Sequence, residues 1–352
     1  MAAQFAFDDV VLAGIESVWP DEVVTSADIE TALGPLYERL RLPAGRLELI
    51  TGIRERRVWP AGMLPGEQSV RTAERLLSRL NVDRARVGML IHGSVCRDYL
   101  EPATASGVHH GLGLSPACMI YDVSNACLGL LNGAVQVAAA IQAGWIELGV
   151  VVGTEQSRPL METTIAALNR DPALTRDSVK QAIASLTIGS GSAALLIAHR
   201  KWFPDAPRFV AGTVGAATEH HRLCHSGRDE AAGDGMAPLM TTDSERLMHA
   251  GIALGAETFR RWTDARGWTV DDFQKTVCHQ VGPTHRKALL AALEIPPERD
   301  YAIVERFGNT GSTALPATLA AALEDGHIVP GDRVGLLGIG SGINTLMLAL
   351  EF

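Results

Sequence analysis

The sequence is poor in lysine and in aromatic side chains, and these shortages exclude several classes of function. Only four of the 31 basic residues are Lys, aromatics make up 5%, and the 352 residues carry a formal net charge of −9. Nucleic-acid-binding proteins usually carry a basic stripe, whereas the densest basic run here, Arg54–Arg57, is interrupted by a Glu. Few aromatic rings also argue against stacking platforms for single strands. We therefore expect no nucleic-acid partner.

Cysteine is scarce as well, and its spacing fits neither a disulfide framework nor a zinc site. The five Cys residues form an odd count and none stands in a CxxC pattern. The His pairs have no acidic or Cys partners at ligand spacing, so no metal is expected. The glycines at 338–342 do not form a GxGxxG motif before a helix, so no bound cofactor is expected either. Unpaired thiols are typical of a reducing compartment, which predicts a cytoplasmic protein.

Long hydrophobic runs are missing too. The start, Met1–Gly14, has no basic segment before an apolar run, so it does not resemble a signal peptide. The longest apolar candidate, Leu128–Ile141, contains Asn132 and Gln136 and falls short of the ~18–20 residues that span a bilayer. We expect no transmembrane segment and, at 47% hydrophobic and 20% charged residues, an ordinary folded protein.

Short apolar runs alternate with helical patterns along the chain. The runs are continuous, which is typical of strands covered by helices on both faces, and the alternation predicts an α/β fold with mostly parallel or mixed sheets. The expected strands are Asp9–Ile15, Val87–Ile91, Met119–Val123, Leu148–Val152, Ala193–Ala198, Phe209–Gly212, Thr276–Val281, Tyr301–Glu305, Arg333–Leu337 and Asn344–Leu350. The clearest helical patterns are Ala27–Leu40, Glu67–Leu80, Ala126–Ala143, Ser244–Ala265, His285–Leu293 and Leu315–Glu324.

An internal repeat divides the chain. The sequence Ile-Gly-Ser-Gly occurs at 188–191 and again at 339–342, each time before an apolar strand, and the two copies lie almost half the chain apart. We expect two halves, residues 1–200 and 205–352, that share one core. Thr154–Ser185 has no counterpart in the second half, and we interpret it as an insertion that caps a cavity or builds an interface.

Cys127 is a candidate nucleophile. It lies in Asp-Val-Ser-Asn-Ala-Cys-Leu-Gly-Leu, where a strand ends near Val123 and a helix begins around Ala126. In the first turn of a helix, the macrodipole and free backbone N–H groups would lower the pKa of the thiol. The helix itself is apolar on nearly all sides and should be buried. The alternative is that Cys127 is a small buried hydrophobe.

Two further residues stand where reactive groups collect in α/β folds. His279, in Val-Cys-His-Gln-Val-Gly, ends a short strand of the second half, and Asn309, in Phe-Gly-Asn-Thr-Gly-Ser, occupies the place in the repeat that Cys127 occupies in the first half. Taken alone, each has a plainer reading, a core His or a turn Asn. A Cys, a His and an Asn together form a recurrent nucleophile set.

These motifs resemble the thiolase superfamily and, within it, the ketoacyl synthase III group, over essentially the whole chain. The resemblance rests on Ser-Asn-Ala-Cys-Leu-Gly at 124–129, Cys-His-Gln at 278–280, Gly-Asn-Thr-Gly-Ser at 308–312 and Gly-Ile-Gly-Ser-Gly at 338–342. It implies a five-layer αβαβα sandwich of duplicated halves and a homodimer. It also implies that Cys127 is acylated by a thioester, that His279 and Asn309 form one oxyanion hole, and that the backbone N–H groups of Cys127 and Ser341 form a second.

Residues 94–106, Ser-Val-Cys-Arg-Asp-Tyr-Leu-Glu-Pro-Ala-Thr-Ala-Ser, resemble the OleA group of bacterial olefin biosynthesis. That group joins two fatty acyl-CoA molecules, and the matching Glu101 would reach the active site of the partner subunit. A malonyl donor makes its enolate by losing carbon dioxide, whereas a plain acyl-CoA must lose an α-proton, so a carboxylate base is useful there. The plainer alternative is an exposed loop Glu.

The resemblance thus implies a non-decarboxylative Claisen condensation of two long-chain acyl-CoA molecules, giving a 2-alkyl-3-ketoacyl product or β-keto acid. Acyl-CoA is the substrate, and downstream enzymes of the pathway are possible partners. One alternative is a ketoacyl synthase III that uses malonyl-ACP, although no basic patch for the carrier protein is evident. Others are an acyltransferase on the same fold, or a silent partner subunit, for which an intact Cys127, His279 and Asn309 set would have no chemical purpose.

Overall fold

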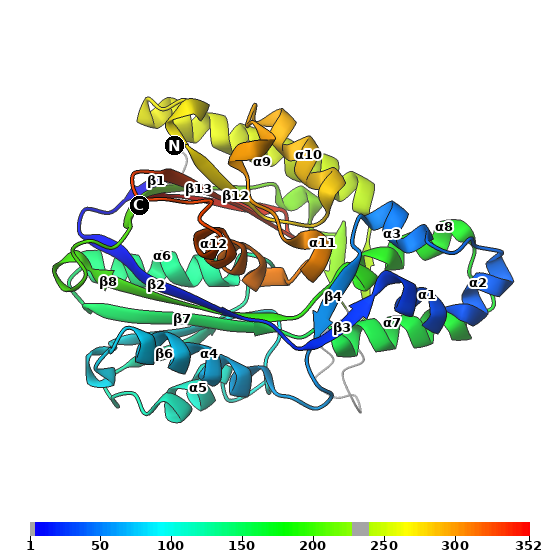
Figure 1. Ribbon diagram of the computed structural model, residues 1–352, viewed down its shortest axis with the longest axis horizontal. Coiled ribbons are helices and arrows are strands. Elements are labelled where there is room, and N and C mark those ends of the chain that lie inside the picture. The colour runs from blue at the N-terminus through cyan, green and yellow to red at the C-terminus, as the bar shows by residue number, and fades with distance from the viewer. Residues whose placement is uncertain (1–3, 227–238) are drawn as a thin grey trace.

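The computed structural model describes residues 4–226 and 239–352, which form five alternating layers of helices and sheet (Figure 1). One outer layer holds α4 (Pro65–Arg79) and α5 (Thr104–Leu112), and the other holds α9 (Ser244–Arg266) and α10 (Pro283–Ala292). The middle layer holds α6 (Gly129–Gln142) and α12 (Ala314–Glu324). Both the α/β class and the expected αβαβα order are confirmed.

The strands of the two halves follow the same order and the same orientations. The first half runs β2 (Val10–Val18), β8 (Gly191–His199), β7 (Leu148–Glu155), β5 (Met89–Gly93) and β6 (Met119–Val123). The second half runs β9 (Arg208–Ala216), β14 (Asn344–Glu351), β13 (Arg333–Gly340) and β12 (Lys275–Cys278). In each half two antiparallel pairs are followed by parallel pairing.

The sheets of the two halves join along one narrow seam between β2 and β9, where Val11 pairs with Arg208. The short strand β1 (Gln4–Ala6) crosses the seam and pairs with β9 of the other half. The shared order supports a duplication. We keep the division into residues 1–200 and 205–352 as a proposal.

The middle layer is largely buried, because α6 and α12 lie between the two sheets. Leu130 and Leu131 of α6 and Leu315 and Leu319 of α12 belong to one apolar core with side chains from both halves. The expectation that the helix after Cys127, apolar on nearly all sides, is buried holds for most of its residues, but Gln136, Ala139 and Gln142 are exposed. This layer places the turns of Cys127 and Asn309, since α6 begins just after the first and α12 just after the second.

Two sequence-based expectations about elements are wrong. Residues 27–40 do not form one helix but two, α1 (Ser26–Ala32) and α2 (Gly34–Leu40), because Pro35 has no N–H to continue the ladder of α1. Tyr301–Glu305 is not a strand. The Gln280 side chain accepts hydrogen bonds from the N–H groups of Ile303 and Val304, and the chain turns into the short helix α11 (Val304–Phe307).

The predicted insertion at 154–185 begins too early, since Thr154 and Glu155 still belong to the buried strand β7. The rest contains α7 (Arg158–Arg170) and α8 (Arg176–Val179), which pack on α1 and α2 through an apolar cluster. With the two-stranded sheet of β3 (Glu22–Thr25) and β4 (Glu55–Val58) it forms a lobe beside the sandwich (Figure 1). The remaining elements are α3 (Arg46–Thr51), β10 (Cys224–Ser226), β11 (Met240–Thr242) and the short turns η1 (Arg84–Arg86), η2 (Lys180–Thr187), η3 (Arg200–Trp202), η4 (Thr218–His220), η5 (Val270–Asp272), η6 (Pro297–Arg299) and η7 (Gly311–Thr313).

Among the residues that the structure describes, no helix has the length and apolar character that a membrane crossing needs.

Candidate active site

Cys127 lies in a tight turn that joins β6 to α6. The turn is sharp because Ala126 adopts a left-handed backbone conformation with φ of 44°, which is uncommon for a residue other than Gly. The helix begins at Gly129, with Leu128 as its cap. Cys127 therefore stands just before the helix, and the prediction that it occupies the first turn is wrong.

An amide network fastens this turn to the second Gly-Ser-Gly turn. Asn125 donates through Nδ2 to Asn344 Oδ1 at 3.1 Å and to Asn132 Oδ1 at 2.8 Å, while Asn344 Nδ2 donates to the Ser341 carbonyl at 3.0 Å. A Cβ placed on Gly340 would lie 3.6 Å from the Cys127 nitrogen, so the two backbones are close neighbours. The structure thus brings together the backbone segments of Cys127 and Ser341 that the resemblance assigned to one oxyanion hole. Sequence analysis missed Asn344, whose partner Asn125 is part of the Cys motif.

His279 follows the end of β12 and is 2% exposed. Its N–H donates to the Leu337 carbonyl at 3.0 Å, which continues the pairing of β12 with β13, the strand that ends at Gly340. Burial lowers the pKa of His279 to about 3, so its imidazole is neutral at physiological pH. A neutral imidazole donates one N–H, which suits an oxyanion hole.

The Asn309 turn is held by hydrogen bonds on both sides. Asn309 N–H donates to the Thr187 carbonyl, and its own carbonyl accepts from Gly189 N–H, both at 2.9 Å. The approach is so close that a Cβ on Gly189 would lie 1.9 Å from the Phe307 carbonyl oxygen, so only Gly fits there. Asn309 Oδ1 accepts from Gly311 N–H at 3.0 Å, which orients the amide and leaves its Nδ2 group as the donor for a ligand.

The ionisation of Cys127 differs from the sequence-based expectation. Burial, followed by the nearby charge of Glu155, raises the pKa of Cys127 to about 12. The predicted lowering by the helix is therefore wrong for this chain, and the sulfur is a protonated thiol at neutral pH. Glu155 is a second residue that sequence analysis missed, because it was assigned to the insertion rather than to the end of β7.

Glu101 lies in the loop between β5 and α5 (residues 94–103), which we call the base loop because it carries the residue predicted to be the catalytic base. The root of the loop is fixed to the end of β7, since Ser94 Oγ donates to the Thr154 carbonyl at 2.9 Å and Gln156 N–H donates to Cys96 Sγ at 3.3 Å. Its tip is exposed, and Glu101 is part of that tip. The Cys127 turn and His279 are thus attached to β13 and the turn that follows it, and the Asn309 turn is attached to residues 187–189, whereas Glu101 lies at the surface.

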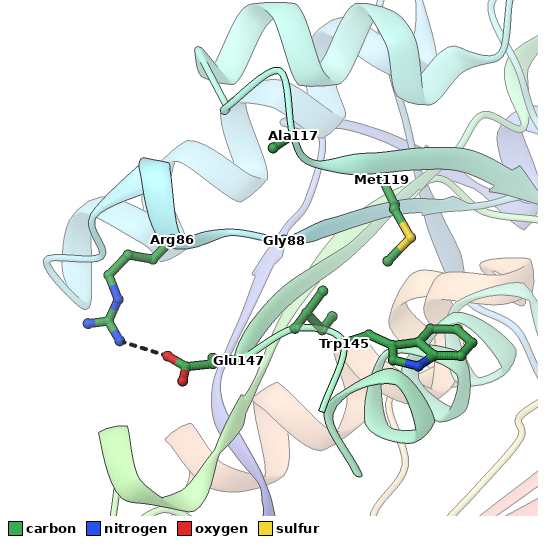
Figure 2. A pocket seen from close by; sticks show the side chains of 7 residues that line it. Arg86, Gly88, Ala117, Met119, Trp145 and Glu147 are labelled. Atoms are coloured by element: carbon green, nitrogen blue, oxygen red, sulfur yellow. Dashed lines mark ion pairs between the residues drawn. The ribbon is translucent and has the colours of Figure 1, made fainter. Parts of the chain in front are cut away.

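A surface hollow of about 470 Å³ lies at the other end of the parallel strands (Figure 2). Gly88, Met119 and Glu147 line it at the beginnings of β5, β6 and β7, whereas the Cys127 turn and the base loop follow the ends of β6 and β5. Figure 2 shows Arg86 and Glu147 as an ion pair at its rim, with a 3.5 Å separation of nitrogen and oxygen. The hollow is thus separate from the Cys127 turn.

Comparisons with known proteins agree with this geometry. Residues 263–352 match the family model for the C-terminal part of 3-oxoacyl-[acyl-carrier-protein] synthase III. Two relatives are acyl-CoA:acyl-CoA alkyltransferases. The one from Shewanella oneidensis is 38% identical over 94% of this chain and 95% of its own, and the one from Xanthomonas campestris is 35% identical over 97% and 98%. The chain belongs to the OleA family of acyl-CoA:acyl-CoA alkyltransferases.

Solved structures of the OleA family match along the whole fold. Cerulenin-bound OleA from Xanthomonas campestris superposes with a TM-score of 0.92 at 34% identity, covering 99% of this chain and 98% of the other. A Cys-to-Ser variant of the same enzyme with bound lauric acid and lauroyl-CoA also gives 0.92 at 34% identity, over 98% and 100%. The thiolase-like fold and the ketoacyl synthase III relationship inferred from the motifs are therefore confirmed. As an OleA-type protein, this chain is a condensing acyltransferase that acts on acyl-CoA.

Proposed function

We propose that the chain joins two long-chain fatty acyl-CoA molecules without decarboxylation and yields a 2-alkyl-3-ketoacyl product or its free β-keto acid. The observation that carries this proposal is the combination of an OleA-family chain with Glu101 on an exposed loop next to the Cys127 turn. The lauroyl-CoA in the Xanthomonas campestris structure supports a long-chain substrate.

In the proposed first step, the Cys127 sulfur attacks the thioester carbon of one acyl-CoA. The sulfur–carbon bond to CoA breaks, the proton of the thiol passes to the departing CoA sulfur, and an acyl-enzyme remains. The negative charge that develops on the carbonyl oxygen is stabilised by the backbone N–H groups of Cys127 and Ser341. The Asn125–Asn344 pair supports this assignment because it fixes the two turns against each other.

In the proposed second step, the Glu101 carboxylate removes the α-proton of a second acyl-CoA. The enolate carbon bonds to the acyl carbon on Cys127, the sulfur–carbon bond of the acyl-enzyme breaks, and the sulfur recovers the proton from Glu101. His279 and Asn309 stabilise the enolate oxygen through N–H donors. A neutral imidazole and an amide whose Oδ1 is already occupied suit that role.

We also propose a homodimer in which Glu101 serves the site of the partner. Strand β6 ends the sheet, and Met119 and Ile120 on it are 39% and 37% exposed. The tip of the base loop adds Tyr99 and Leu100, which are also exposed. An uncovered edge strand beside exposed apolar side chains is typical of a surface that a second copy covers. Sedimentation at micromolar concentration should show a dimer, and a stable monomer would contradict this proposal.

One experiment separates this function from that of a ketoacyl synthase III. The enzyme is incubated with a single long-chain acyl-CoA, with and without malonyl-ACP, and the products are analysed by mass. We expect a condensed product from acyl-CoA alone that carries the carbons of both acyl chains. A product that forms only when malonyl-ACP is present would overturn the proposed function.

A further inference from the structure

Glu155 is a buried carboxylate at the end of β7 that the proposed mechanism does not use. It is 4% exposed, and none of the ion pairs found among residues 4–226 and 239–352 includes it. A carboxylate inside a protein needs hydrogen-bond donors in place of water. Glu155 Oε1 finds them in Val95 N–H at 3.1 Å and in Ser312 N–H at 3.2 Å.

The Ser312 hydroxyl strengthens the same junction. Its oxygen lies 2.5 Å from Glu155 Oε1 and 2.9 Å from the Gly93 carbonyl oxygen. Since the hydroxyl has a single proton, it donates to one of these acceptors at a time. Glu155, Gly93 and Ser312 are therefore packed into one hydrogen-bonded cluster that joins the ends of β7 and β5 to η7.

The two backbone donors belong to two segments that must be correctly placed relative to each other for the proposed reaction. Val95 belongs to the root of the base loop, whose tip carries Glu101, and Ser312 lies three residues after Asn309. Between Asn309 and Ser312, Gly311 has a left-handed backbone conformation with φ of 56°. A Cβ placed on it would lie 3.1 Å from Glu155 Cδ. The Asn309 turn is thus shaped around the carboxyl group of Glu155.

We propose that Glu155 is a positioning residue for the condensation step, because its carboxylate holds the Asn309 turn and the root of the base loop in one fixed arrangement. This inference rests on the proposed roles of Asn309 and Glu101. Condensation needs both segments at once, whereas acylation of Cys127 needs neither Glu101 nor its loop. Loss of the Glu155 junction should therefore slow condensation more than acylation.

The split between condensation and acylation is a readout that a purely structural role would not move, and the charge of Glu155 gives a second one at Cys127. That charge contributes to the raised pKa of Cys127. Glu155→Gln keeps an acceptor oxygen for Val95 and Ser312 but removes the charge, so the Cys127 thiol should ionise at lower pH. Each unit of that shift gives about tenfold more thiolate, and about that much faster alkylation, at a fixed pH.

The test compares Glu155→Gln, Glu155→Ala and Ser312→Ala with a matched control, Glu147→Gln. Glu147 precedes the opposite end of β7, where it pairs with Lys201 and Arg86 at the surface. Three quantities are measured for each protein: acyl-enzyme mass after incubation with acyl-CoA, condensation rate, and the pH dependence of iodoacetamide labelling on the Cys127 peptide. Peptide mapping is required because Cys96 also lies near Glu155.

We expect Glu155→Ala to lower condensation about tenfold or more while acyl-enzyme still forms, and Ser312→Ala to act in the same direction more weakly. Labelling of Cys127 in Glu155→Gln should move to lower pH, and Glu147→Gln should behave as the wild type. Wild-type condensation in Glu155→Ala, or acylation and condensation that fall equally in that variant, would overturn the proposal, and an unmoved labelling curve in Glu155→Gln would show that no charge on Glu155 acts on Cys127. If Glu155→Ala does not fold, as judged by thermal unfolding, the proposal is tested with Glu155→Gln and Ser312→Ala instead. Failure of the wild type to condense acyl-CoA alone would instead overturn the proposed function, while the labelling shift stays measurable.

Discussion

The Cys127 turn and the base loop follow neighbouring parallel strands, yet they differ in how the rest of the chain holds them. Cys127 lies against backbone from the second half, and Asn125 and Asn344 tie the two together across 219 residues of sequence. The base loop is fixed at its root and at Asp98, whose Oδ1 accepts from Gly66 N–H at 2.7 Å, whereas its tip, with Tyr99, Leu100 and Glu101, is exposed. One chain therefore assembles the groups proposed for acylation, whereas the proposed base for condensation faces outward.

This difference agrees with the two proposed steps. The first step needs a nucleophile and donors held rigidly around one carbonyl, which a duplicated fold supplies by bringing two similar turns together. The second step needs a base near the acyl-enzyme, and we propose that the partner subunit supplies it. Each variant below removes one functional group, and acylation and condensation are then measured separately.

The largest effect is expected for Cys127→Ala, which removes the proposed nucleophile from the Cys127 turn. No acyl group should be found on the protein after incubation with acyl-CoA, and condensation should fall by at least ~10³-fold. Mass analysis of the intact protein and its peptides checks this. An acyl group on another Cys, in the wild type or in this variant, would remove Cys127 from its proposed role.

Asn309→Ala should lower condensation by about 10²–10³-fold, because one preorganised donor to the developing oxyanion is lost. Asn309→Asp is the matched variant: it keeps the size and the Oδ1 acceptor for Gly311 N–H but replaces the donor with a carboxylate. Both variants should be equally slow. Activity in Asn309→Asp near that of the wild type would show that Asn309 only shapes its turn.

Glu101→Gln should separate the two steps. Acyl-enzyme should form on Cys127 as in the wild type, while condensation of plain acyl-CoA falls by at least ~10²-fold because the base is lost. The ratio of acyl-enzyme to condensed product is the measurement. Near-normal condensation in this variant would exclude Glu101 as the base. It would also contradict the proposal that the base loop serves condensation.

A smaller effect is expected from pH. Because burial and Glu155 raise the pKa of Cys127 to about 12, the thiolate fraction should grow about tenfold for each pH unit between pH 7 and 10. Iodoacetamide labelling of the Cys127 peptide should follow that slope without a plateau. A plateau below pH 8 would mean that the helix lowers the pKa, as the sequence alone suggested.

The sequence predicted the fold well where the signal was local. Continuous apolar runs located β6 and β7, and the two Gly-Ser-Gly copies indicated the duplication that the strand order displays. The expectation of a strand at Tyr301–Glu305 was wrong because the side chain of Gln280 binds the N–H groups that a ladder would have used. Such a contact between segments cannot be read from local hydrophobicity.

The same distinction holds for the site. Motifs pointed to Cys127, His279 and Asn309, whose roles stay predictions. The residues that hold them, Asn344 and Glu155, went unnoticed because their partners are distant in sequence. The predicted direction of the Cys127 pKa shift was wrong for the same reason. A helix end is visible in the local sequence, whereas burial and the nearby charge of Glu155 are not.

The most direct test of the central claim uses mixed dimers of Cys127→Ala and Glu101→Gln subunits. If Glu101 acts across the dimer, a mixed dimer holds one complete site, formed by Cys127 of the Glu101→Gln subunit and Glu101 of the Cys127→Ala subunit. Random reassociation makes about half the dimers mixed, so condensation should return to about a quarter of the wild-type rate. The account predicts that recovery from two variants that are inactive alone. No recovery, in mixtures shown to contain mixed dimers, would contradict it.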